Sequence, residues 1–113
     1  MVFKSGETTS TIYPGYAVVL STTEDQTVVL TTTEASTLVA GIAMQEIAPG
    51  SYGRVRVFGL TSATIDGSVT AGDYVGTSAT AGHVKTITPS VGNVLGVAFT
   101  SGTGTQKIFV NRM

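Results

Sequence analysis

Short apolar runs recur along the chain about every ten residues, each bounded by Gly, Pro, Asp or Ser. They are rich in Val, Ile and Thr, which favour β-strands, and no stretch holds a convincing helical period. The best helical candidate, residues 36–46, contains Gly41, and glycine weakens a helix by roughly 1 kcal/mol. The pattern predicts an all-β fold of the small sandwich or barrel type. The predicted strands are Ala17–Leu20, Thr27–Thr31, Val39–Ala43, Arg54–Phe58, Ala63–Ile65, Tyr74–Gly76, Val84–Ile87, Leu95–Phe99 and Lys107–Val110.

The phrase V-x-G-[I/V]-A occurs twice, at residues 39–43 and 94–98. The first copy is followed by APGSYG (48–53) and then by the strand-like GRVRV. The second copy is followed by SGTGTQ (101–106) and then by QKIFV. We interpret SGTGTQ as a hairpin loop that matches APGSYG. Upstream stand PGYAV (14–18) and AGDYV (71–75), so the period is about 55 residues. This predicts two similar β units, about 14–59 and 71–113, that close one core within a single domain. Chance recurrence in a Val-rich chain is the alternative.

The glycines of the repeated phrase, Gly41 and Gly96, lie inside apolar strands. A glycine in such a place usually marks a bulge or a close approach of two backbones. We therefore interpret both as structural glycines.

Residues 1–13 have no counterpart in the second unit and contain a polar run of Ser and Thr. One interpretation is a frayed terminus, which is common. The other is an extended arm that becomes ordered on a neighbouring molecule, because Val2, Phe3, Ile12 and Tyr13 are too apolar for an indifferent tail. Both interpretations remain open at this point.

The composition limits the classes of partner. Charged residues make up 12% of the chain and the net charge is −1, which gives no general attraction to nucleic acid or to an anionic membrane. Cysteine is absent, and the start of the chain is too polar for a signal peptide. No apolar run is long enough to span a membrane. The mean hydropathy of +0.32 is high for a small soluble monomer, which indicates that some apolar surface meets a partner.

The residues give little support to catalysis. The one histidine, His83, lies in TAGHVKT and is interpreted as a solvated turn residue. The acidic residues are dispersed, and several stand in turn-like pairs, where an Asp side chain hydrogen-bonds its own backbone. These pairs are Glu24-Asp25, Asp66-Gly67 and Gly72-Asp73. Such a role accounts for these residues without catalysis. The sequence shows neither the pattern of a catalytic triad nor that of a set of metal ligands. We expect no enzyme activity, no metal and no cofactor.

Alternation in GRVRVFG places Arg54, Arg56 and Phe58 on one face of a strand. Two arginines beside an aromatic ring suit a phosphate or nucleic acid, but no basic stripe accompanies them. Because Arg is enriched in protein–protein interfaces, we interpret these three residues as an interface candidate.

Several segments together resemble the phage capsid decoration, or cement, protein family. They are AGDYV (71–75), VGTSATAGHVKT (75–86), VGNVLGVAFTSGTGTQKIFV (91–110) and LVAGIAMQEIAPGSYGRVRVFGL (38–60). The resemblance implies a β-barrel or β-tulip-like fold, attachment to the outer face of an icosahedral head, and a major capsid protein as partner. Similarity to lambda-type decoration proteins implies a homotrimer and an N-terminal arm that contacts the capsid. By that analogy the candidate capsid-binding residues are Val2, Phe3, Lys4, Thr8, Thr9, Ile12 and Tyr13.

Two other functions compete with this one. Another virion β module, associated with a fibre or tail, would bind a host glycan or a partner protein, although the absence of Trp disfavours a glycan site. A small β-barrel hydrolase is disfavoured by the single histidine and the lack of cysteine. The expected location is the exterior of a virion, after synthesis in the host cytoplasm.

Overall fold

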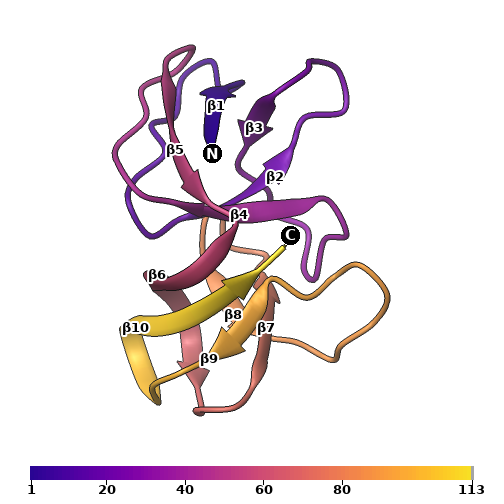
Figure 1. Ribbon diagram of the computed structural model, residues 1–113, viewed down its shortest axis with the longest axis vertical. Helices are drawn as coiled ribbons and strands as arrows, with labels where there is room; N and C mark the ends of the chain where they lie inside the picture. Colours follow the sequence, from indigo (N-terminus) through magenta and orange to yellow (C-terminus); the bar gives the residue numbers. More distant parts are fainter. Residues whose placement is uncertain (113) are drawn as a thin grey trace.

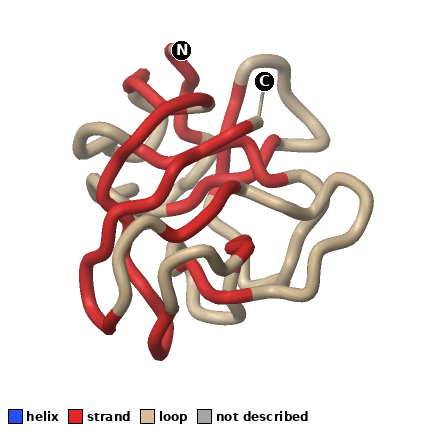
Figure 2. The backbone as a smooth tube through the Cα atoms, turned by 60° about the horizontal axis from the view of Figure 1, so that its bottom comes forward, coloured by secondary structure: helices blue, strands red, loops and turns tan. Residues whose placement is uncertain are grey.

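The computed structural model describes residues 1–112, and all of the regular elements in that range are β-strands (Figures 1 and 2). They form two closed five-stranded barrels, one above the other in Figure 1. The first barrel has the order β1-β3-β2-β4-β5, and the second has β10-β6-β8-β7-β9. The all-β prediction with two similar units is confirmed. The strands are β1 (Val2–Ser5), β2 (Ala17–Leu20), β3 (Thr27–Val29), β4 (Val39–Ala43), β5 (Tyr52–Arg56), β6 (Phe58–Val69), β7 (Tyr74–Thr77), β8 (Val84–Thr86), β9 (Gly96–Ala98) and β10 (Gly102–Asn111).

The two barrels repeat the same strand pairing. In the first, β1 pairs parallel to β3 and antiparallel to β5; in the second, β6 pairs parallel to β8 and antiparallel to β10. The antiparallel pairs β2–β3, β2–β4 and β4–β5 recur as β7–β8, β7–β9 and β9–β10. Each barrel is therefore one copy of the repeat, and the copies begin at β1 and β6 rather than at residues 14 and 71.

The N-terminal segment is part of the first barrel. Strand β1 lies between β3 and β5, and the side chains of Phe3 and Ser5 point inward and are buried. Ile12, fully buried, forms an isolated bridge to Ile47. The expectation of an extended arm is thus wrong for these residues. The physical reason is that β1 closes the barrel and supplies the pairing that β3 and β5 would otherwise lack.

Two buried clusters fill the molecule. One fills the first barrel and the other fills the second, but the second cluster also takes in four side chains from the outer side of β2 and β4. The barrels therefore share a core instead of meeting only through a linker. The four shared side chains are Ala17, Val19, Val39 and Ile42.

A β-bulge lets β4 serve both clusters. In the β2–β4 pairing Val18 lies opposite Gly41 and Val19 lies opposite Val39, so one extra residue, Ala40, stands in β4. After the bulge the side chains no longer alternate simply between two faces. Ala40 and Ala43 consequently enter the first-barrel cluster, while Val39 and Ile42 reach the second, and all five residues of β4 are buried.

The SGTGTQ segment is not a hairpin loop. Residues from Gly102 onward belong to β10, which pairs along the length of β6 with an irregularity between Thr103 and Thr105. The intervening Gly104 has φ +70°, a conformation that glycine adopts without strain. The loop-like composition therefore marks a bulge inside a long strand.

Candidate functional site

The predicted capsid-binding residues divide into buried and exposed groups. Phe3 and Ile12 are core residues of the first barrel; Ile12 is fully buried, and Phe3 is 7% exposed. Lys4 is half-buried and lies 3.7 Å from the Glu24 carboxylate. The exposed members are Val2, Thr8, Thr9 and Tyr13.

The predicted Arg54, Arg56 and Phe58 group is divided between the barrels. Arg54 lies in β5 and its Nε donates a hydrogen bond of 3.1 Å to the Gln45 side-chain oxygen. The guanidinium of Arg56 folds over Gly59 and donates to the Phe58 carbonyl oxygen at 3.4 Å. The chain bends at Val57, and Phe58 begins the second barrel with an exposed ring. Each arginine thus makes a contact within the chain, although the Nε of Arg56 is buried without a hydrogen-bond partner among the described residues.

The clearest exposed feature is an apolar surface on the outside of the second barrel, here called the aromatic face. Pairing places Tyr74, Val97, Phe109 and Leu60 side by side across β7, β9, β10 and β6. Phe109 points outward because its neighbours Ile108 and Val110 fill the interior. The rings of Phe58 and Phe99 lie with centroids 5.2 and 6.0 Å from that of Phe109. The aromatic face comprises Phe58, Leu60, Tyr74, Val97, Phe99 and Phe109.

A second apolar surface is a groove of about 310 Å³ at one end of the first barrel. We call it the first-barrel mouth. The guanidinium of Arg112 lies at its rim and donates to the carbonyl oxygens of Val39 (2.8 Å), Val94 (3.0 Å) and Thr37 (3.5 Å), so this cation is already hydrogen-bonded. The other residues that line the mouth are Met1, Phe3, Leu20, Val39, Ala40 and Val57.

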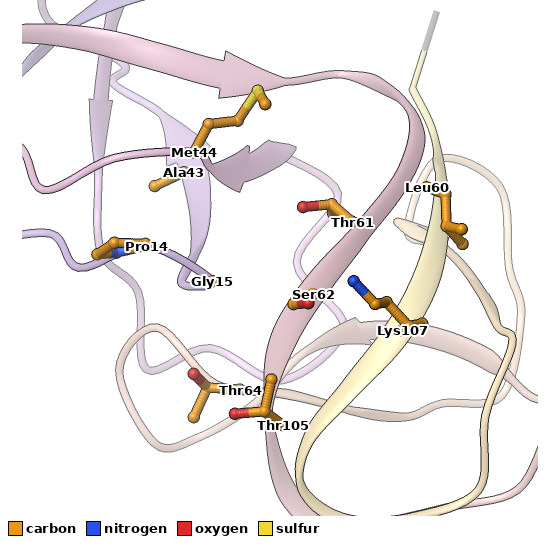
Figure 3. A pocket seen from close by; sticks show the side chains of 10 residues that line it. All are labelled: Pro14, Gly15, Ala43, Met44, Leu60, Thr61, Ser62, Thr64, Thr105 and Lys107. Atoms are coloured by element: carbon orange, nitrogen blue, oxygen red, sulfur yellow. The ribbon is translucent and has the colours of Figure 1, made fainter.

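A third hollow, the inter-barrel groove, has a volume of about 340 Å³. Pro14, Ala43 and Met44 of the first barrel form one side of it, and residues of β6 and β10 form the other (Figure 3). The second side carries hydroxyl groups and the exposed ammonium group of Lys107, so this groove is more polar than the first-barrel mouth. Its residues there are Leu60, Thr61, Ser62, Thr64, Thr105 and Lys107.

Other ionisable side chains of residues 1–112 make local contacts. Within residues 1–112 no three His, Cys, Asp or Glu side chains lie close enough to hold a metal ion. His83 is half-buried, packs against the ring of Tyr16 and faces the Ala81 carbonyl oxygen at 3.1 Å. Asp66 is not a turn residue as expected, because it lies within β6 and accepts a hydrogen bond from the Ser78 hydroxyl. These contacts are structural.

One ion pair joins the two barrels. The Lys85 ammonium lies 2.9 Å from the Glu34 carboxylate, and this hydrogen bond together with the opposite charge raises the pKa of Lys85 above its ordinary value. Within residues 1–112, no helix has the length and apolar character needed to cross a membrane.

Of the aromatic face, sequence reasoning named only Phe58, as part of the interface candidate. The signal was present in QKIFV, where Phe109 is an apolar residue at a position whose neighbours are also apolar. A strand with one buried face should carry polar residues on the other. An apolar residue at an outward position therefore indicates a surface that binds a partner.

Comparison with solved structures gives a likeness over nearly the entire chain. No protein-family model matches the sequence, and no curated protein matches it either. Among solved structures, the N base of the head fibre gp8.5 of bacteriophage phi29 has a similar structure, with a TM-score of 0.71 and 14% sequence identity. The match covers 99% of this chain and 92% of that chain. At this identity the likeness shows the fold alone, which the two proteins share over nearly all of this chain.

Proposed function

We propose that this chain is a virion structural protein that attaches to the outer surface of a phage head as a decoration protein, with the major capsid protein as its partner. The observation that carries the proposal is the two-barrel fold, which matches the N base of a phage head fibre across nearly the entire chain. The capsid decoration family that the sequence resembles is also associated with the outside of phage heads.

The surface of the molecule suits adhesion. The chain exposes the aromatic face and carries few charges, so contacts made there depend on apolar burial more than on ion pairs. Stable protein interfaces bury about 800 Å² on each partner, and many copies on one shell add their contributions. Adhesion of this kind loses little strength as salt increases, because screening acts on exposed charges.

Binding to empty heads tests the proposal directly. Heads assembled from the major capsid protein encoded in the same genome would be mixed with the purified chain and sedimented. We expect saturable co-sedimentation that persists at high salt, and new density on the outer surface in electron cryomicroscopy. An unrelated protein of similar size and net charge is the control. Absence of binding to both unexpanded and expanded heads would reject the proposal.

A second candidate is another virion module, associated with a fibre or tail, that binds a host glycan or a partner protein. The likeness to a fibre base favours it, and so does the inter-barrel groove, whose hydroxyls and Lys107 offer hydrogen bonds beside Met44 and Leu60. A reproducible hit on a glycan array, abolished by Thr61→Val together with Lys107→Met, would establish this function in place of decoration.

A further inference from the structure

The matched pairing of the two barrels allows positions to be compared one by one. Val18 pairs with Gly41 as Val75 pairs with Gly96, and these two valines both point into their barrels. Leu20 pairs with Val28 as Thr77 pairs with Val84. From this register Leu20 is equivalent to Thr77. By the same reasoning Ala40 is equivalent to Leu95, Val57 to Val110, Ala17 to Tyr74 and Ile42 to Val97.

The end of the second barrel that is equivalent to the first-barrel mouth is closed. Thr77 lies there with 1% of its surface exposed, because the loop between β3 and β4 covers it. Its hydroxyl donates to the Thr33 carbonyl oxygen at 2.7 Å and accepts from the Ser36 amide at 2.8 Å. Beside this loop, Ala17 and Ile42 from the outer side of β2 and β4 pack into the second-barrel cluster. The first barrel thus covers this end of the second barrel.

Within residues 1–112, the corresponding end of the first barrel is covered only at its rim, by the side chain of Arg112. Leu20, the equivalent of Thr77, is 43% exposed. Val57 is half-buried, whereas its equivalent Val110 is fully buried. The apolar groove described above lies at this position. Three of its residues, Leu20, Ala40 and Val57, are the equivalents of residues of the second barrel that are buried: Thr77, Leu95 and Val110.

In the first barrel, the outer side of β2 and β4 packs against the second-barrel cluster. The outer side of β7 and β9 is its equivalent in the second barrel, and part of it is exposed. Ala17 and Ile42 are fully buried, whereas Tyr74 and Val97 stand in the aromatic face, where Tyr74 is 49% exposed. Gly76, the equivalent of Val19, is buried against Ile87, so the equivalent surface is exposed only at its Tyr74 and Val97 side. The described residues therefore form one such contact between barrels and leave one open mouth and one partly exposed contact surface.

We propose that the aromatic face of one copy docks on the first-barrel mouth of a second copy, repeating between molecules the contact that joins the two barrels within one molecule. The occupant is a second copy because the mouth is the counterpart of one that already receives this protein's own strands. The two cations at the mouth keep hydrogen-bond acceptors when it is covered: Arg112 donates to three carbonyl oxygens, and the amino group of Met1 donates to the Val55 carbonyl oxygen at 3.1 Å. Such a contact joins unlike surfaces, so successive copies close into a ring or extend as a filament.

Two variants that each block one surface test this contact. Leu20→Glu places a charge in the mouth, and Tyr74→Glu places one on the aromatic face; both positions are exposed, so the barrels keep their cores. Val91→Glu, at a residue that is 95% exposed and belongs to neither surface, is the matched control. Circular dichroism and thermal unfolding would verify folding, and Leu20→Lys repeats the mouth test with the opposite charge.

Light scattering after size-exclusion chromatography gives the result. We expect multiples of 11.5 kDa for the unmodified chain and for the control, and a single 11.5 kDa species for each blocked variant. An equimolar mixture of the two blocked variants retains one intact mouth and one intact face, so it should form a dimer of twice 11.5 kDa. A monomeric unmodified chain, unchanged assembly of both variants, or no dimer in the mixture would overturn the proposal. The experiment contains no phage heads, so its failure is separate from failure of the proposed function.

Discussion

Gly41 lies so close to the carbonyl group of Arg56 on the neighbouring strand that a Cβ atom at this position would overlap the carbonyl oxygen. The second barrel repeats the relationship, with Gly96 against the carbonyl group of Phe109. Both glycines are the third residue of the repeated phrase V-x-G-[I/V]-A, so the phrase marks a close approach of β4 to β5 and of β9 to β10. The obstacle is backbone, which cannot rotate away as a flexible side chain would.

Gly41→Val and Gly96→Val should therefore each destabilise the protein by roughly 1–3 kcal/mol, because strands must move apart to admit the new side chain. The expected fall in Tm is roughly 5–15 °C for a domain of this size. Ala79→Val, which adds methyl groups at an exposed position, is the control and should leave Tm nearly unchanged. Unchanged melting of both glycine variants would show that the strands relax freely at these points.

The second prediction concerns Phe3. Its substitution distinguishes a structural role of the N-terminal segment from a role in binding a partner. Phe3→Ala should cost about 3–5 kcal/mol by leaving a cavity in the first barrel. The adjacent Val2→Ala, at an exposed position of the same strand, should cost less than about 0.5 kcal/mol. Urea unfolding of the two variants measures the difference. Equal, small effects would indicate that β1 detaches readily and acts as an arm after all.

Much of this fold could be predicted from the sequence, because local composition and turn residues mark most strands. Ala17–Leu20 and Val39–Ala43 were predicted with the bounds that the structure has. Strand β1 was missed because its place depends on parallel pairing with β3, a partner far along the chain that no local pattern reveals. The boundary between β5 and β6 was missed for another reason. Outward and inward positions continue to alternate from Arg54 to Phe58, straight through the bend at Val57 that changes barrels.

The surfaces were harder to predict than the strands. Alternation tells which residues share a face, but in β10 both faces carry apolar residues, so the sequence does not show whether Ile108 or Phe109 points inward. The equivalence of Leu20 and Thr77 likewise becomes visible only through the register of each barrel. The pairing of an open mouth with a partly exposed contact surface is therefore a property of the three-dimensional repeat.

Arg112 gives the third prediction. Its guanidinium connects β4 of the first barrel to the segment before β9 of the second, through the carbonyl oxygens of Val39 and Val94. Arg112→Ala leaves these acceptors without their charged donor, and we expect a loss of about 1–3 kcal/mol. Arg54→Ala, which removes an exposed contact with Gln45, should change stability by less than about 0.5 kcal/mol. Urea unfolding monitored by tyrosine fluorescence checks both values, and an effect of Arg112→Ala no larger than that of the control would contradict the assigned role.

The Lys85–Glu34 ion pair gives a prediction with a defined pH dependence. Because its partner raises the pKa of Lys85 in the folded state, the stabilisation is fully present below the ordinary value of 10.5 and is lost as the pH rises through the folded-state pKa. The difference in Tm between the unmodified chain and Lys85→Gln should therefore be small and positive at neutral pH, shrink on adding salt, and vanish at strongly alkaline pH. Lys107→Gln is the control, since Lys107 forms no ion pair within residues 1–112. A Tm difference for Lys85→Gln that grows above pH 10.5 would show that the lysine stabilises the junction through its apolar stem rather than its charge.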